Sequence, residues 1–212
     1  LNAEALTAAV KIAESTSRTA PTPTRRIFEK ALDAAYNEPL RAQAKKIFAE
    51  IARYEDFIAM WMISGPYTAK EVSLFEHAFA PEKQNDASAS WSKLQFEIDP
   101  EEPWLVPLDK ILGGENRVAY LRAKVWSDKA QPARLELGSN DGVKAWLNGE
   151  LVHGNNINRG VTPGEDRVAI TLKEGENVLL LKIIQNSGRW GACARVRGVA
   201  GDHLEGVKVV VE

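Results

Sequence analysis

The apolar residues of this chain repeat with two different periods. In residues 1–54 they recur every three or four positions, the spacing of one face of a helix. Thr22-Pro23 and Glu38-Pro39 place a proline where a helix begins, because the missing N–H leaves no bond unmade there. The pattern predicts three short amphipathic helices, whose apolar faces are Leu6, Ala9, Val10 and Ala13; Phe28, Leu32, Ala35 and Tyr36; and Leu40, Ala44, Ile47, Phe48 and Ile51.

After Tyr54 the pattern changes to short runs that are rich in aromatic and β-branched residues and separated by Gly and Pro. Alternation of apolar and polar residues, as in 119–125 and 168–172, is typical of half-buried strands. We predict strands at Phe57–Ile63, Ser90–Ile98, Arg117–Trp126, Ala133–Leu137, Val143–Leu147, Leu151–His153, Arg167–Leu172, Asn177–Gln185 and Gly191–Arg197, with a last one over Val207–Val211.

About nine short strands with turn signals and no intervening helices predict a mainly β fold, an antiparallel β-sandwich of the jelly-roll kind. We therefore divide the chain into a helical segment, residues 1–54, and a β-sandwich domain, residues 55–212. The helices resemble the end of an α-solenoid such as HEAT repeats, but they are too few to form a stable solenoid. Residues 64–89 form a long connection, which we expect to be functional or to wrap the sandwich.

The stretch from Leu135 to Asn156 carries the strongest local signals. Asn148-Gly149 lies between two apolar runs, the pattern of a two-residue hairpin turn in which both positions have positive φ. A second turn signal, Asn140-Asp141-Gly142, lies upstream, and residues 174–177 read as a further hairpin turn. The prediction is a set of linked strands with amide- and acid-rich loops at one end.

The segment SNDGVKAWLNGELV, residues 139–152, resembles the signature of the protective-antigen-type sugar-binding β-sandwich family. More broadly, residues 61–212 are similar to the galactose-binding-like jelly rolls appended to bacterial polysaccharide-degrading enzymes. In some of these relatives two adjacent acids in the turn hold a calcium ion that coordinates sugar hydroxyls. The resemblance implies a calcium site at Asn140 and Asp141, although asparagine at the first position removes one negative charge. The other interpretation is that Asp141 only shapes the turn.

Polar residues beside this turn are candidates for ligand binding. Asn155, Asn156 and Asn158 place three amides within four residues, which suits hydrogen bonding to sugar hydroxyls. His153 ends the preceding strand, although a lone histidine is more often structural. Trp190 follows a polar loop, so we predict that its ring stacks on a sugar. Four other tryptophans lie within predicted strands and are expected in the core or in a groove: Trp61, Trp91, Trp126 and Trp146.

Composition and charge argue against several classes of function. The net charge of −2 gives no strong field to attract nucleic acid or an anionic membrane, and no run of 18 apolar residues could span a bilayer. The single cysteine, Cys193, excludes an intramolecular disulfide and reads as a buried, inert thiol. The chain begins at Leu1, and we expect it to be a mature or truncated piece of a longer protein.

The sequence contains no Gly-x-Ser-x-Gly elbow and no phosphate-binding loop, and it does not bring any two of its 29 acids together as a catalytic pair. The favoured hypothesis is a non-catalytic carbohydrate-binding module of a larger extracytoplasmic protein (periplasmic, secreted or cell-surface). The alternative is a structural or protein-interaction sandwich with no sugar ligand, which would contact a neighbouring domain of the full-length protein.

Overall fold

The computed structural model describes residues 3–17, 20–33, 38–83 and 88–210. Two predicted helix positions, Ala35 and Tyr36, lie outside these residues, as do the side chains of Leu6, Leu32, Leu40 and Ala44. The chain divides into two compact units, Leu1–Phe57 with Ile98–Pro103, and Ile58–Glu97 with Trp104–Glu212.

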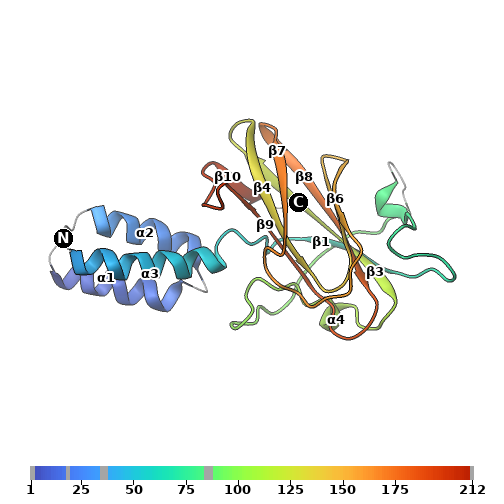
Figure 1. Cartoon of the computed structure of the whole chain (residues 1–212), viewed down its shortest axis with the longest axis horizontal. Coiled ribbons are helices and arrows are strands. Elements are labelled where there is room, and N and C mark those ends of the chain that lie inside the picture. Colours follow the sequence, from blue (N-terminus) through green and yellow to red (C-terminus); the bar gives the residue numbers. More distant parts are fainter. Residues whose placement is uncertain (1–2, 18–19, 34–37, 84–87, 211–212) are drawn as a thin grey trace. The chain divides into compact units, whose positions relative to one another are not determined.

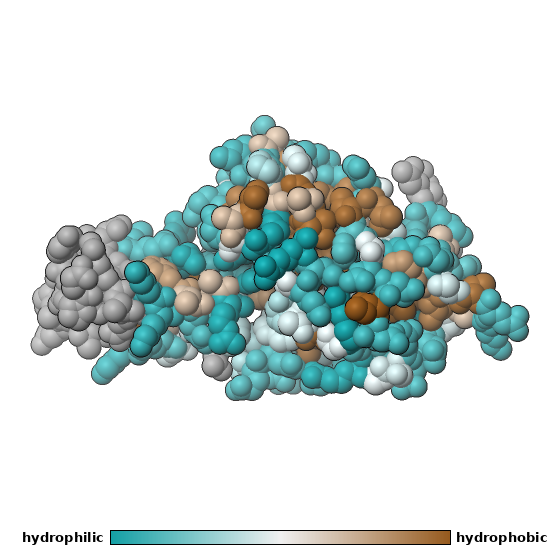
Figure 2. Space-filling model, in the orientation of Figure 1, coloured by the Kyte–Doolittle hydropathy of each residue, from teal (hydrophilic) through white to brown (hydrophobic). Residues whose placement is uncertain are grey.

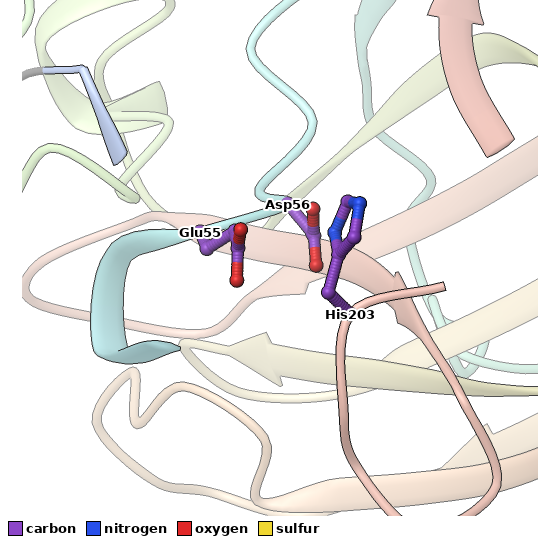
Figure 3. A group of neighbouring side chains, drawn as sticks. All are labelled: Glu55, Asp56 and His203. Carbon is purple, nitrogen blue, oxygen red and sulfur yellow. The ribbon is translucent and has the colours of Figure 1, made fainter. Parts of the chain in front are cut away.

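The first unit contains the three predicted helices, α1 (Ala3–Thr16), α2 (Pro21–Asp33) and α3 (Glu38–Tyr54). Their apolar faces meet in a small core of Val10, Ala13, Phe28, Ile47 and Ile51. Just after α3, the fully buried Glu55 accepts a hydrogen bond from Arg25 Nε at 2.7 Å. Glu55 and the next residue, Asp56, are drawn in Figure 3, together with His203 of the second unit.

The second unit is a sandwich of two antiparallel sheets (Figure 1). The larger sheet has the order β2 (Ser92–Lys93), β1 (Met62–Tyr67), β3 (Arg117–Ser127), β8 (Gly175–Gln185), β5 (Val143–Leu147) and β6 (Glu150–Asn155), with β10 (Val207–Val210) also paired to β3. The smaller sheet has the order β7 (Asp166–Leu172), β4 (Gln131–Ser139) and β9 (Ala192–Arg197). This confirms the predicted fold class, an antiparallel β-sandwich preceded by a short three-helix segment.

The turns divide into two kinds. At Asn148-Gly149 both φ angles are positive, 53° and 86°, and the turn joins the paired strands β5 and β6, so the predicted hairpin is correct. The turn at 140–142 instead joins β4 of one sheet to β5 of the other. Residues 173–174 likewise join β7 to β8 across the two sheets, so the hairpin predicted there is wrong. Both turns therefore lie where the chain crosses from sheet to sheet.

The alternating residues of β3, β4, β5 and β8 form a single core between the sheets. The first two strands were placed less well: β1 begins at Met62 rather than Phe57, and β2 has only two residues. The sandwich also contains two short helices that were not expected, η1 (Ala80–Glu82) and α4 (Leu108–Ile111). Within the described residues, no helix combines the length and apolarity needed to cross a membrane.

Residues 68–83, which we call the strap, belong to the long connection after β1. The strap packs on the outer face of the larger sheet, the face turned away from the core. Its Phe79 joins Val118, Tyr120 and Ile184 in a second apolar cluster, against which Leu74 and Phe75 also pack. The part of the long connection formed by the strap therefore wraps the sandwich.

Candidate functional site

The turn after β4 ties together three loops at one end of the sandwich, which we call the rim. Asp141 is 5% exposed and has a positive φ of 59°. Its Oδ1 accepts a hydrogen bond from the backbone N–H of Arg159 at 3.3 Å, in the β6–β7 loop. Its Oδ2 accepts one from the backbone N–H of Asn186 at 2.7 Å, in the β8–β9 loop. Asp141 thus links the three rim loops to one another.

Asn140 also contributes to this join. Its amide nitrogen donates to the backbone carbonyl of Arg159 at 2.6 Å, while its Oδ1 is buried with no hydrogen-bond partner. One oxygen of this side chain is therefore available as an acceptor. Both oxygens of Asp141 already accept backbone hydrogen bonds. The calcium site implied for this pair stays a prediction.

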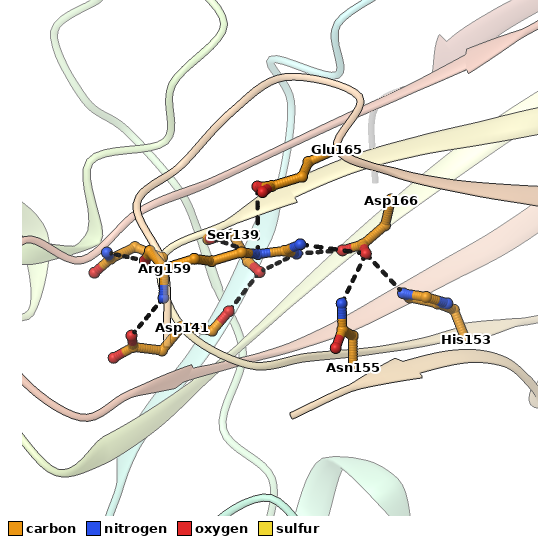
Figure 4. Close-up of polar contacts among 8 residues, drawn as sticks. Ser139, Asp141, His153, Asn155, Arg159, Glu165 and Asp166 are labelled. Atoms are coloured by element: carbon orange, nitrogen blue, oxygen red, sulfur yellow. Dashed lines mark hydrogen bonds and ion pairs between the residues drawn. The ribbon is translucent and has the colours of Figure 1, made fainter. Parts of the chain in front are cut away.

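Arg159 is the centre of the polar contacts at the rim (Figure 4). Its guanidinium forms an ion pair with Asp166 at the start of β7, and its Nη2 donates to Ser139 Oγ at 3.0 Å. A further contact runs from its Nε to Glu165 at 3.5 Å. The side chain of Arg159 is 9% exposed and that of Asp166 is 8% exposed, so the pair is shielded from water and anchors the β6–β7 loop.

Two predicted site residues belong to this buried network (Figure 4). The Asn155 amide donates to Asp166 Oδ1 at 2.9 Å, and His153 Nε2 lies 3.5 Å from the same oxygen. In the strand register His153 pairs with Ala145, a core residue, so these β6 side chains point between the sheets. Their contacts with Asp166 join β6, at the edge of the larger sheet, to β7 of the smaller sheet.

The charge of Asp166 is held by its neighbours. Burial raises the pKa of its carboxyl group, but hydrogen bonds from Arg159 and Asn155 and the positive charge of Arg159 outweigh this effect. The net pKa of Asp166 lies below its ordinary value. The carboxylate is therefore ionised at neutral pH, which suits an anchor rather than a general acid, because an acid catalyst needs a raised pKa.

The exposed amides of the rim lie in the β6–β7 loop and contact the β8–β9 loop. Asn156 and Asn158 are exposed, and Asn158 Oδ1 accepts a hydrogen bond from the side-chain amide of Asn186. Because Asp141 and Arg159 fix both loops, these amides lie on backbone that is held in place. Of the predicted ligand-binding residues, Asn156 and Asn158 are the two whose side chains are exposed at the rim.

Trp190 does not lie where the sequence placed it. Its side chain is 1% exposed and belongs to the main core, so neither ring face is open to a sugar. The reason is a bridge between Val106 and Ala192, which draws the end of the β8–β9 loop onto the sandwich. The backbone carbonyl of Trp190 also accepts a hydrogen bond from Asp109 N–H at 2.9 Å. The stacking role predicted for Trp190 is therefore wrong in this structure.

A second buried polar cluster lies beneath the strap and was not foreseen. Lys182 of β8 is fully buried, and its Nζ donates to the carbonyls of Phe75 at 3.1 Å and His77 at 2.7 Å and to Glu82 Oε1 at 2.7 Å. The hydroxyl of Tyr120 also donates to Glu82 Oε1. Burial lowers the pKa of Lys182, and hydrogen bonding to Glu82 opposes that shift. Lys182 fastens the strap to the sheet.

Cys193 is buried and carries no disulfide, as predicted. Burial raises the pKa of its thiol to about 12, so the reactive thiolate is scarce at neutral pH.

The sequence matches no family model and no curated protein. Among solved structures it is similar to a family 35 carbohydrate-binding module from an environmental isolate, with 13% identity, a TM-score of 0.35, and coverage of 44% of this chain and 72% of that one. It is also similar to the PA14 domain of the MpAFP antifreeze protein, with 16% identity, a TM-score of 0.35, and coverage of 45% and 52%. A third is the β-glucosidase of Kluyveromyces marxianus, with 15% identity, a TM-score of 0.43, and coverage of 65% and 16%.

The chain thus spans about half of the PA14 domain chain and a small part of the β-glucosidase.

Proposed function

We propose that the sandwich is a non-catalytic carbohydrate-binding module of a larger extracytoplasmic protein, and that it holds a sugar at the rim. The observation that carries this proposal is the pair of exposed amides, Asn156 and Asn158, on a loop fixed by Asp141 and the buried Arg159–Asp166 ion pair. Amides both donate and accept hydrogen bonds, as sugar hydroxyls do. A fixed loop reduces the ordering that binding would cost.

The chemistry of the rim favours binding over catalysis. Asp141 accepts two backbone hydrogen bonds, and the pKa of Asp166 is lowered by its partners. Glycoside hydrolysis uses a carboxylic acid of raised pKa together with a second carboxylate. These two carboxylates are thus engaged in holding the loops.

The test is a glycan array probed with the whole chain, followed by calorimetry on the best neutral oligosaccharide. The double variant Asn156→Ala/Asn158→Ala removes the exposed amides, and we expect the dissociation constant to rise about tenfold, since hydrogen bonds contribute about 0.5–1.5 kcal/mol each. Thr171→Ala, an exposed polar position on β7 away from the rim, serves as the control and should bind as the parent does.

Calcium is tested in the same titration. Repeating it with EDTA and with added calcium shows whether Asn140 Oδ1 takes part in an ion site. Asn140 stands where calcium-binding relatives have an acid, and Asp141 already accepts two backbone hydrogen bonds. We therefore expect the same sugar affinity with EDTA and with calcium.

The alternative, a structural or interaction module, has one observation of its own. In the helical unit Ile12 of α1 is 52% exposed and Ile27 of α2 is 58% exposed, so two large apolar side chains are open to a partner. If no glycan on the array binds at millimolar concentration, the carbohydrate proposal fails and this alternative takes its place.

A further inference from the structure

The outer face of the larger sheet extends beyond the strap, and there it carries cationic and aromatic side chains. On β3, Leu121, Ala123 and Val125 point into the core. Side chains alternate along a strand, so Arg122, Lys124 and Trp126 point outward. The space-filling view shows that apolar side chains reach the surface of the sandwich among polar ones (Figure 2). Trp126, on this face, is 38% exposed.

A shallow groove, open to solvent, lies on this sheet beside Arg122 and Lys124. It forms where β1 begins and β10 ends, because both strands pair with the same edge of β3: Met62 pairs with Arg122, and Val210 pairs with Lys124. The groove is lined by three cations, Lys93, Arg122 and Lys124, and by the apolar Met60, Met62 and Val210.

Among the described residues that line the groove, every charged side chain is a cation, and this favours an anion. Lys124 Nζ does approach Glu176 at 3.2 Å. That pair is exposed, with 26% and 46% of the side chains accessible, and exposed pairs of this kind contribute little. The lysine can therefore turn to an incoming carboxylate or sulfate group at small cost.

Aromatic rings lie beside the cations. Trp126 lies two residues beyond Lys124 on the same face of β3, about 6–7 Å along the strand. Its indole Nε1 donates to Asp128 Oδ1 at 2.9 Å, which fixes the ring. The guanidinium of Arg122 lies over the ring of Trp91, 4.3 Å from its centroid. The half-buried Trp146 lies on the same face, one strand beyond Arg122's neighbour: Trp146 pairs with Leu180 of β8, and Leu180 pairs with Arg122.

We propose that this groove binds an acidic polysaccharide, with one acid group among Lys93, Arg122 and Lys124 and a neighbouring sugar ring on Trp126. A pyranose presents an apolar C–H face that packs on an indole, and this distinguishes the expected ligand from a purely acidic protein surface. The ligand class rests on the proposed carbohydrate function, but the site and its test are independent of the rim.

The experiment is calorimetry of the whole chain with four probes: oligogalacturonate (carboxylated), chondroitin sulfate (sulfated), dextran (neutral) and poly-glutamate (acidic without sugar). We expect one or both acidic glycans to bind, and the affinity to fall as salt rises. Lys93→Gln/Lys124→Gln should raise the dissociation constant for the acidic glycan about tenfold, since two lost charge contacts are worth about 1–2 kcal/mol. Lys70→Gln/Lys173→Gln, which removes two exposed lysines away from the groove, is the matched charge control.

Trp126→Ala should also weaken binding of the acidic glycan, whereas Leu151→Ala, which removes a more exposed apolar side chain from β6, should not. The proposal is overturned if the groove variants bind the acidic glycans as the parent does, or if poly-glutamate binds as well as they do and Trp126→Ala changes nothing. The rim variant Asn156→Ala/Asn158→Ala separates the two proposals. If that variant loses binding to dextran or another neutral sugar but still binds the acidic glycan, the loss is specific to the rim site.

Discussion

The carboxylate of Asp141 accepts a hydrogen bond from the backbone N–H of Asn186 at 2.7 Å, although the two residues are 45 positions apart. The second oxygen of the same carboxylate accepts from Arg159 N–H, so a single buried side chain joins three loops. A turn acid that could be a metal ligand by its sequence is, in the folded chain, an acceptor for backbone donors. The stability of the rim therefore depends on its charge.

Replacing Asp141 by Asn should destabilise the sandwich by about 2–3 kcal/mol. An amide has one acceptor oxygen where the carboxylate has two, so one of the two buried N–H donors loses its partner. Urea unfolding followed by tryptophan fluorescence reports on this unit, since all six tryptophans lie within its residues. Asp202→Asn, an exposed acid in another loop, should change the free energy of unfolding by less than about 0.5 kcal/mol. Equal effects of the two variants would show that Asp141 does not tie the loops.

The Arg159–Asp166 pair should make stability depend on acidic pH. The pKa of Asp166 is lowered in the folded chain, so its contribution is complete above the unfolded value of about 3.9 and is lost as pH falls through the folded pKa. We expect the free energy of unfolding of the parent to fall below about pH 4. Asp166→Asn should be less stable at pH 7 and should lose less on acidification.

The pKa of Glu136 is also lowered, because hydrogen bonds and charge from Arg195 and Arg134 outweigh the effect of its burial. Glu136 will therefore contribute to the same acid transition, and Asp166→Asn should remove only part of it. If the parent and Asp166→Asn differ by a constant amount between pH 7 and pH 3, the ion pair does not act as described.

The strap should be released when its buried cation is removed. Lys182→Met leaves Glu82 and two carbonyls without their donor, and we expect a loss of about 3–5 kcal/mol. Adding Glu82→Gln removes the uncompensated charge, so the double variant should recover part of that loss. Limited proteolysis should cut the strap of Lys182→Met faster than that of the parent.

Lys144→Met is the matched control for the strap. The side chain of Lys144 is 13% exposed, against 0% for Lys182, and its Nζ lies 3.2 Å from Glu76. Because the side chain of Glu76 is 71% exposed, water can replace its lost partner, and breaking this pair should cost less than about 1 kcal/mol. A Lys144→Met variant as damaged as Lys182→Met would mean that burial of the lysine is not what matters.

Most strands could be predicted because alternation reports burial directly. Val143–Leu147 was predicted with the bounds that β5 has, and each of its alternate residues faces the core. The contacts that hold the loops could not be predicted, because they join residues far apart in the chain. The partner of Lys182, Glu82, lies 100 residues away. The one available signal was a lysine inside the apolar run of β8, a position that needs a buried acceptor.

The tryptophans show the same limit. Trp126 and Trp146 were expected in the core or in a groove because they lie within strands. The structure excludes the core for both, since they point from the outer face of the sheet. The sequence gives the period of a strand but does not say which set of alternate residues faces inward when both sets contain aromatic residues. Trp190 follows a polar loop, and only the bridge from Val106 to Ala192 shows that it is buried.

The burial of Trp190 leads to a prediction that separates core from surface. Trp190→Ala should destabilise the sandwich by about 3–5 kcal/mol, because it removes a large side chain from a packed interior. Trp126→Ala, at a side chain that is 38% exposed, should cost less than about 1.5 kcal/mol and leave the fold intact. Both are measured by urea unfolding, followed by circular dichroism so that the lost tryptophan does not alter the signal. If Trp190→Ala were as stable as Trp126→Ala, the indole of Trp190 would not fill the core, and a place for it in sugar stacking would be open again.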